Sequence, residues 1–154
     1  MSQDIQVRLA ESRDAGAIVK FNVAMARETE HKELSQPVVT RGVRALFDNP
    51  QHGFYVVAET ADEVVGSLMI TYEWSDWRCG VFWWIQSVYV KPEFRRRGIF
   101  TRLHEFLKVR AAQDPDVCGF RLYFEQSNNA AATTYNKIGM TKTTYGVFEQ
   151  EFQQ

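Results

Sequence analysis

The sequence has little cysteine and no long apolar run. Its two cysteines, Cys79 and Cys118, stand too far apart in 154 residues for the C-x-x-C spacing of a redox motif or a zinc site. No stretch approaches the roughly 20 consecutive apolar residues that cross a bilayer. The opening residues, MSQDIQVR, carry no apolar run behind a basic patch, so we expect no secretory signal. Together these absences predict a cytoplasmic protein with reduced cysteines and no membrane partner.

An excess of charge of either sign is also absent. Lys and Arg number 18 and Asp and Glu number 19, so the net charge is −1. This balance argues against a strongly basic nucleic-acid binder and against an acidic disordered tail. The 3 histidines lack the paired spacing of a metal site, so we expect no metal. The motifs G-x-S-x-G, H-E-x-x-H, G-x-G-x-x-G and G-x-x-x-x-G-K-[ST] do not occur, which leaves hydrolase, zincin, dinucleotide and P-loop hypotheses without support.

Apolar residues are plentiful, at 45% of the chain. A chain of this length buries roughly two thirds of its unfolded surface, so we expect one domain over residues 1–154. Apolar periodicity predicts strands at 5–9, 54–58, 64–72, 81–90 and 120–125, and a last strand or tight hairpin at 143–152. It predicts helices at 12–25, 40–47, 98–108 and 131–138, the first two capped by Ser12 and Thr40. This order indicates an α+β fold with a mixed, mostly antiparallel central sheet and helices on both faces.

A basic segment, Arg95-Arg-Arg-Gly-Ile-Phe100, lies between the predicted strand 81–90 and the helix that follows. Backbone N–H groups at a helix start have no partner within the helix, and with the helix dipole they form an anion site. Gly98 lets the backbone approach a ligand closely, and the three arginines add positive charge. The segment suits a phosphate group, although a solvated arginine cluster beside an ordinary loop is the alternative interpretation.

A second pattern places Asn128, Ala131, Tyr135 and Gly139 at offsets of 0, 3, 7 and 11 residues. This spacing puts Asn128 at the start of a helix and puts Ala131 and Tyr135 on one side of it. Tyr135 then either directs its hydroxyl along the helix toward a strand end or packs as an ordinary core residue. Taken alone, the pattern does not separate the two.

Together, the two segments resemble the GNAT superfamily of N-acetyltransferases, which transfer acetyl from acetyl-CoA to amines. Val88-Tyr-Val-Lys-Pro-Glu-Phe-Arg-Arg-Arg-Gly-Ile99 is similar to the family's fourth strand and (Gln/Arg)-x-x-Gly-x-(Gly/Ala) signature, and the Asn-x-x-Ala-x-x-x-Tyr-x-x-x-Gly spacing is similar to its next block. The resemblance extends over almost the whole chain. It departs at Phe100, where the family has Gly or Ala, and we expect this side chain to turn into the core beside Leu103.

The resemblance implies a set of cofactor contacts. The backbone of Val88, Tyr89 and Val90 would pair with the pantetheine arm of acetyl-CoA. The pyrophosphate would be held by the segment that follows: Arg95, Arg96, Arg97, Gly98, Ile99, Phe100 and Thr101. Asn128 would contact the pantetheine region, and Tyr135 would stand near the sulfur and protonate the departing thiolate. A tyrosine hydroxyl, with an ordinary pKa near 10, is a reasonable acid for that step.

The base that deprotonates the amine is harder to identify. The hairpin 71–78 and strand 82–88 are similar to the diamine acetyltransferase branch, where an acidic residue of the fourth strand helps in this step. Gln86 stands at the matching position and cannot accept a proton. Glu73, Asp76 and Glu125 remain as candidate bases, each of which also fits an exposed carboxylate with no such role. Loss of the proton through a water chain is a further alternative.

The acceptor is expected to be a primary amine of a small molecule. We expect it to lie near Glu28, Glu30, Trp84 and Gln86, although acidic residues at a helix end are more commonly only solvated. Strand alternation should turn half of the hairpin tryptophans into the core. The others would wall the acceptor pocket or contact a second copy in a homodimer, for which the short segment from Thr143 is also suited. The four tryptophans are Trp74, Trp77, Trp83 and Trp84.

Three other functions compete with this interpretation. Gln86 and Phe100 favour a non-catalytic CoA-binding sensor or complex subunit, and acetylation of a protein or peptide amine is a second alternative. RNA binding through residues 95–97 is a third, but the net charge of −1 argues against it. Release of CoA in the presence of amines separates an enzyme from a pure binder.

Overall fold

The computed structural model describes residues 4–153, and the chain divides into two compact units at Tyr123/Phe124. The first unit contains β1 (Gln6–Leu9), α1 (Ala15–Glu30), α2 (Gln36–Asp48), β2 (Gly53–Glu59), β3 (Val64–Ser75), β4 (Gly80–Val90), α3 (Ile99–Ala112) and β5 (Val117–Leu122). Single 3₁₀ turns at Ser12–Asp14 and Pro92–Phe94 precede α1 and α3. The second unit contains α4 (Asn129–Lys137). None of the helices within residues 4–153 is long and apolar enough to cross a membrane.

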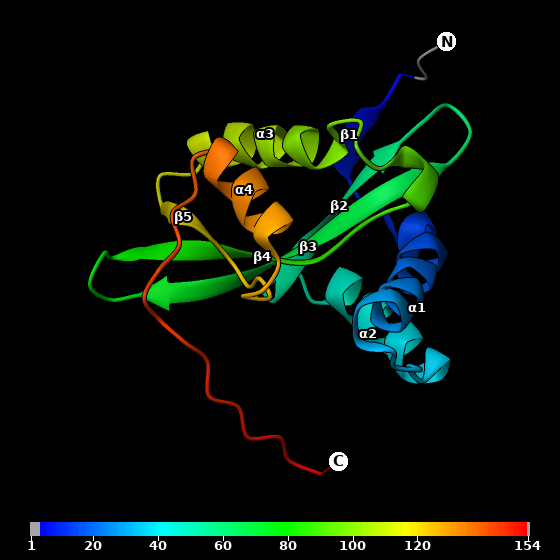
Figure 1. Ribbon diagram of the computed structural model, residues 1–154, viewed down its shortest axis with the longest axis horizontal. Coiled ribbons are helices and arrows are strands. Elements are labelled where there is room, and N and C mark those ends of the chain that lie inside the picture. Colours follow the sequence, from blue (N-terminus) through cyan, green and yellow to red (C-terminus); the bar gives the residue numbers. More distant parts are fainter. Residues whose placement is uncertain (1–3, 154) are drawn as a thin grey trace. The chain divides into compact units, whose positions relative to one another are not determined.

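The five strands form one sheet in the order β1-β2-β3-β4-β5. The first four strands pair antiparallel, and β5 joins β4 in parallel, with α3 as the crossover. Figure 1 shows β3 and β4 continuing past the other strands as a long hairpin. The predicted mixed, mostly antiparallel sheet is confirmed.

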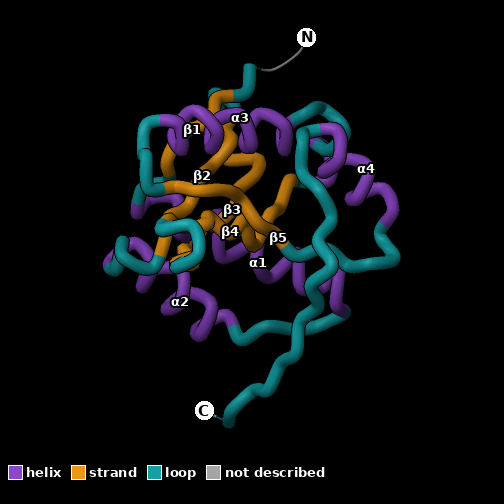
Figure 2. Tube along the Cα trace, turned by 90° about the vertical axis from the view of Figure 1, so that its left-hand side faces the viewer, coloured by secondary structure: helices purple, strands orange, loops and turns teal. Residues whose placement is uncertain are grey.

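Helices cover both faces of the sheet, as Figures 1 and 2 show for α3 on one side and α1 with α2 on the other. Alternation along β2 supplies both cores: Val56 and Ala58 pack with α3, while Tyr55 and Val57 pack with α1 and α2. On the α3 side, Leu107 is fully buried. Burying a side chain of this size stabilises the fold by about 1.5–3 kcal/mol.

The helices of the first unit are longer than the periodicity predicted. α2 begins at Gln36 and not at Thr40, because the Ser35 side chain accepts a hydrogen bond from the Val38 N–H and Pro37 occupies the first turn. The helix that was expected to end near residue 25 continues to Glu30. At α1 the polar residues 27–30 continue the helix past its last buried residue, Ala26, whereas at α2 the additional first turn contains Val38 and Val39.

The predicted last strand or hairpin at 143–152 is wrong. These residues contain neither helix nor strand, and four large side chains stay exposed: Tyr145, Val147, Phe148 and Phe152. A strand needs a neighbouring strand to accept its backbone hydrogen bonds, and α4 is the only regular element among the described residues of the second unit. β5 is also shifted, since it occupies Val117–Leu122 and not 120–125.

Candidate functional site

A β-bulge interrupts β4 near its end. Ser67 of β3 pairs with Tyr89, but Met69 pairs with Gln86, so β4 carries one residue more than β3 across this interval. Ser87 takes up the difference with a φ of 52°, a left-handed conformation that costs a residue with a Cβ about 1–2 kcal/mol. Bulges commonly re-aim backbone groups beside active sites. Strained residues of this kind concentrate at functional sites, so Ser87 is a candidate site residue.

The bulge reverses which side chains face which helix. Before it, Ile85 packs into the core under α3, and after it, Val88 and Val90 pack against the same core. Tyr89 is thereby turned to the opposite face, where its ring lies 5.2 Å from that of Phe21 in α1. Without the extra residue, strict alternation would place Tyr89 on the side of Ile85.

β4 loses its second neighbour at the same point. β5 pairs with β4 from Val81 to Ile85, and its last pair joins Ile85 to Leu122. From Gln86 to Val90, β4 pairs with β3 alone among the strands of residues 4–153. This edge of β4 has the geometry to hydrogen-bond an extended ligand as an added strand.

The loop that follows β4 has the conformation of an anion site. Arg96 has a φ of 63° and Gly98 a φ of 75°, so two left-handed residues lie directly before the first turn of α3 at Ile99. Left-handed residues of this kind turn successive N–H groups toward one concavity, and the helix dipole adds a partial positive charge. Gly98 is required by its backbone angle and not by crowding, since a Cβ there would meet open space.

The three arginines of this segment have different surroundings. Arg95 is turned back onto β4, where its Nε donates a 2.8 Å hydrogen bond to the Val90 carbonyl. The Arg97 guanidinium lies over the Phe94 ring at 5.3 Å, and Arg96 is exposed. Phe100 packs against the core under α3, which confirms the orientation that the sequence predicted for it.

Two of the candidate bases accept hydrogen bonds from neighbouring groups. Glu73 accepts through Oε1 from the indole Nε1 of Trp84 (3.3 Å) and from Nη1 of Arg121 (2.5 Å). Glu125, in the second unit, accepts from the backbone N–H and the hydroxyl of Ser127. Asp76 lies exposed in the hairpin turn. None of the three carboxylates is therefore marked out as a base by its contacts.

The sheet face that carries α1 and α2 brings together three of the predicted residues, Glu73, Trp84 and Gln86. Gln86 Nε2 donates to the Thr71 hydroxyl at 2.5 Å. Trp84 lies against Tyr123, with ring centroids 4.5 Å apart.

Sequence analysis missed Tyr123, Thr71 and Arg121, whose guanidinium lies 3.7 Å from the Phe82 ring. Arg121 and Tyr123 belong to no motif, and Thr71 only begins the hairpin 71–78. Strand register places Thr71 and Arg121 on either side of Trp84, and Tyr123 follows directly after β5. Only Trp83 of the four tryptophans is buried, while Trp74 and Trp77 are 62% and 88% exposed.

The acidic residues at and just after the end of α1 do not act as one group. Glu28 accepts hydrogen bonds from the Tyr89 hydroxyl (3.0 Å) and from Nη2 of Arg95 (2.7 Å). Glu33 pairs with Arg27 at 2.7 Å, and Glu30 is exposed. Glu28 therefore contacts two residues predicted to bind the cofactor, although it was itself predicted to bind the amine.

The second unit carries the other predicted motif. The Asn128 side chain caps α4 by accepting a hydrogen bond from the Ala131 N–H at 3.0 Å, which confirms the predicted helix start. Tyr135 lies on this helix and is half-buried, and burial raises the pKa of its hydroxyl above 10. Gly139 follows the helix with a φ of 94°. The hydroxyl of Tyr135 thus stays protonated at neutral pH.

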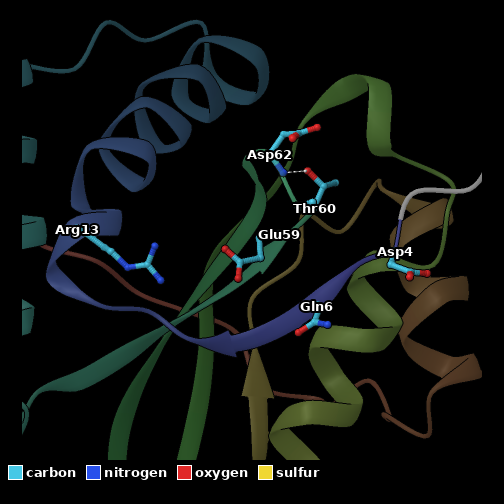
Figure 3. A pocket seen from close by; sticks show the side chains of 7 residues that line it. Asp4, Gln6, Arg13, Glu59, Thr60 and Asp62 are labelled. Atoms are coloured by element: carbon cyan, nitrogen blue, oxygen red, sulfur yellow. Dashed lines mark hydrogen bonds between the residues drawn. The ribbon is translucent and has the colours of Figure 1, made fainter.

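One hollow of the first unit lies elsewhere. A pocket of about 610 Å³ is lined from β1, the 3₁₀ turn and the β2–β3 turn, and Figure 3 shows the side chains around it. None of the residues selected from the sequence lines it. Within residues 4–153 there is also no cluster of three or more His, Cys, Asp or Glu side chains placed to hold a metal ion.

The model of the acetyltransferase (GNAT) family matches residues 23–140, well over half of the chain. The curated protein sequences give no match.

Solved structures match along almost the full length. A possible acetyltransferase from Clostridium difficile 630 is 45% identical, with a TM-score of 0.89 over 97% of this chain and 99% of that one. A predicted acetyltransferase with acetyl-CoA from Clostridium acetobutylicum is 18% identical, with a TM-score of 0.75 over 96% of each chain. Glucosamine-6-phosphate N-acetyltransferase from Arabidopsis thaliana is 16% identical, with a TM-score of 0.72 over 96% of this chain and 99% of that one. The chain belongs to the GNAT family and is an acetyltransferase.

Proposed function

We propose that this enzyme moves the acetyl group of acetyl-CoA directly to the primary amine of a small molecule. The observation that carries the proposal is the continuity of residues 86–101. The unpaired edge of β4, from Gln86 to Val90, leads into the left-handed turn at Arg96 and Gly98 and then into the N-terminus of α3. An amide-bearing arm joined to a pyrophosphate needs a strand edge followed by an anion site, in that order.

The first unit would bind most of the cofactor. The backbone of Val88–Val90 hydrogen-bonds the pantetheine arm, and the N–H groups of residues 96–101 hold the pyrophosphate together with the exposed charge of Arg96. A backbone N–H beside the Ser87 bulge stabilises negative charge that develops on the thioester oxygen. The strained φ of Ser87 supports this role, because it redirects the backbone at the point where β4 loses its second neighbour.

The second unit would supply the acid. Asn128 contacts the pantetheine region, and the Tyr135 hydroxyl protonates the departing thiolate. The support is the family match, which runs through residue 140, together with the tyrosine hydroxyl itself, which is protonated at neutral pH and can donate its proton. The same match spans the division at Tyr123/Phe124, so we infer that both units serve one acetyltransferase domain.

The amine would approach the sheet face that carries Trp84 and Gln86. Glu73 and Glu125 already accept hydrogen bonds from neighbouring side chains, so we assign the proton of the incoming ammonium to ordered water. Trp84 is partly exposed and the ring of Tyr123 beside it is exposed, so the two side chains can form an aromatic wall for a small amine. Glu30, exposed near the end of α1, adds negative charge that attracts a cation.

The exposed hairpin tryptophans support a further proposal, that this acetyltransferase forms a homodimer. Trp74 and Trp77 expose 62% and 88% of their surface, which is uncommon for the free surface of a monomer. Light scattering of the purified chain tests the proposal, and a monomer at all concentrations would contradict it.

The release of free thiol from acetyl-CoA in the presence of a panel of primary amines tests the enzymatic proposal. We expect at least one small amine to stimulate release, and Tyr135→Phe to lower turnover about 100-fold while changing acetyl-CoA affinity little. Wild-type chain that binds acetyl-CoA but releases no thiol with any amine would contradict small-molecule transfer. Unchanged turnover of Tyr135→Phe would remove Tyr135 from the acid role.

A further inference from the structure

A three-residue network joins the end of α1 to the loop after β4. The Glu28 carboxylate accepts from Nη2 of Arg95 at 2.7 Å through Oε2 and from the Tyr89 hydroxyl at 3.0 Å through Oε1. The guanidinium of Arg95 also lies 5.3 Å from the centroid of the Tyr89 ring. Each oxygen of the carboxylate thus accepts from a different residue, and both of these residues lie more than 60 positions after Glu28 in the sequence.

The contacts of Glu28 stabilise a negative charge at a position on its helix where such a charge is disfavoured. It lies in the last turn of α1, which ends at Glu30, where the helix dipole disfavours a negative charge. The hydrogen bond from Arg95 nevertheless holds the pKa of Glu28 below its usual range, so the charged form is the favoured one. The bulge at Ser87 is what turns Tyr89 toward this carboxylate.

Arg95 connects this network to the anion-binding loop. Its Nε donates to the carbonyl of Val90, the last residue of β4, at 2.8 Å, while its backbone leads directly into Arg96. Arg96 has a φ of 63°, a conformation that persists only where the surroundings hold it. Arg95 is fixed at both ends of its guanidinium, by Val90 and by Glu28, and the strained residue is its immediate neighbour.

We propose that Glu28 is a positioning residue that holds Arg95, and through it the turn from Arg96 to Gly98, in the conformation that receives the pyrophosphate of acetyl-CoA. The inference rests on the proposed function. In this role Glu28 stabilises the cofactor loop and does not bind the amine. Arg95 holds the loop backbone in place and does not bind the phosphate. The end of α1 and the cofactor loop therefore form one mechanical unit.

Calorimetric titration of acetyl-CoA into wild type and variants tests this role without knowledge of the amine. We expect Glu28→Ala to weaken binding about tenfold, because a charge-assisted contact to Arg95 is lost. Glu28→Gln keeps one carbonyl oxygen that can accept from Arg95 and an NH₂ group that can donate to the Tyr89 hydroxyl oxygen, so its binding should recover to within about threefold of wild type. Adding Arg95→Ala to Glu28→Ala should weaken binding no further than Arg95→Ala alone, because the two residues act together.

Glu63→Ala is the matched control, because it removes a 2.9 Å ion pair to Lys91 just after β4 and leaves the hydrogen bonds of Glu28, Tyr89 and Arg95 in place. Its acetyl-CoA affinity should equal that of wild type. Urea unfolding shows whether each variant is folded. If Glu28→Ala does not fold, Tyr89→Phe replaces it as the test variant, because it removes one hydrogen bond to Glu28 and keeps the ring. Tyr89→Phe should weaken acetyl-CoA binding by a smaller factor, about twofold to threefold.

Folded Glu28→Ala that binds acetyl-CoA as wild type does would overturn the inference. A rise in KM for the amine alone, at unchanged acetyl-CoA affinity, would also overturn it and return Glu28 to the acceptor site. Tyr89→Phe with unchanged affinity, where it stands in for Glu28→Ala, counts against it equally. Wild-type chain that fails to bind acetyl-CoA is a separate result, since it overturns the proposed function itself.

Discussion

The two halves of β4 differ in almost every respect that matters for function. From Val81 to Ile85 the strand is paired on both sides, by β3 and by β5, and its side chains alternate regularly. From Ser87 to Val90 it has one strand neighbour, a left-handed residue and a reversed alternation. The first half is thus a central strand of the sheet, whereas the second half is an edge strand whose outer backbone groups can pair with another partner.

Under the proposed function, one strand serves both folding and cofactor binding. The regular half fills the core, with Trp83 and Ile85 both buried. The irregular half lacks the stabilising hydrogen bonds of a second strand neighbour, so its edge is open. The left-handed residues Arg96 and Gly98 extend this irregular backbone to the start of α3. Substitutions in the two halves should therefore separate stability from cofactor binding.

Ile85→Ala should have the largest effect, and it should act on stability. Ile85 is 2% exposed, so truncation leaves a cavity in the core under α3 and lowers the free energy of unfolding by about 2–5 kcal/mol. Urea denaturation measures the loss, and acetyl-CoA affinity of the folded protein should change less than about twofold. An Ile85→Ala variant that has lost acetyl-CoA affinity but keeps wild-type stability would contradict the separation of stability and cofactor binding between the two halves.

Ser87→Val should act mainly on turnover. A β-branched side chain is poorly suited to a φ of 52°, so we expect a loss of stability of about 1–2 kcal/mol and, where the bulge is displaced, a fall in kcat of about tenfold or more. Ser87→Gly is the matched variant, because glycine accepts this φ, and it should retain kcat. Equal kcat for the Val and Gly variants would show that the bulge plays no part in the reaction.

Gly98→Ala should have a moderate effect on both properties. A Cβ at a φ of 75° costs about 1 kcal/mol of stability, and the shifted turn should weaken acetyl-CoA binding severalfold. Gly42→Ala, in the interior of α2 with open space around it, should instead raise the free energy of unfolding by about 0.5–1 kcal/mol. Thermal unfolding and calorimetry compare the two, and opposite signs are the expected result.

His104 should produce the smallest effect, a pH dependence of stability. It lies buried on α3 with its ring 5.7 Å from Phe120, the β5 partner of Trp83, and its Nδ1 has no hydrogen-bond partner within the described residues. Burial lowers its pKa, with the nearby charge of Lys108 acting in the same direction and Glu105 opposing it.

The folded protein keeps this histidine neutral, while the unfolded chain protonates it below about pH 6.5. Stability should therefore fall as the pH is lowered from about 6.5, and should level off below the folded pKa. His104→Leu should flatten that part of the profile in urea titrations between pH 5 and pH 8. A profile that stays as steep in His104→Leu as in wild type would assign the pH dependence to other groups.

Local patterns predicted much of the fold, and they failed where a contact between distant residues decides the outcome. The apolar runs that became β2, β3 and β4 and the amphipathic start of α3 were visible in the sequence. The strand expected at 143–152 was not formed, because strand-like composition does not supply a neighbour. The bulge carried no signal either, since Ser87 is not a residue that marks a left-handed position.

The candidate site divides in the same way. The start of α3 after Gly98 and the cap at Asn128 could be predicted because helix starts have a local chemical signature. The partners of Glu28 could not, because 61 and 67 residues separate it from Tyr89 and Arg95. Only the fold brings them within hydrogen-bond distance.

Hydrogen exchange with and without acetyl-CoA tests the central claim most directly, because it reports on the two halves of β4 in one experiment. We predict that acetyl-CoA slows exchange at the amides of 88–90 and 96–101 and leaves 81–85 unchanged, since those are already paired on both sides. Protection confined to other segments, or no protection at saturating acetyl-CoA, would contradict the assignment of the open half of β4 and its loop to the cofactor.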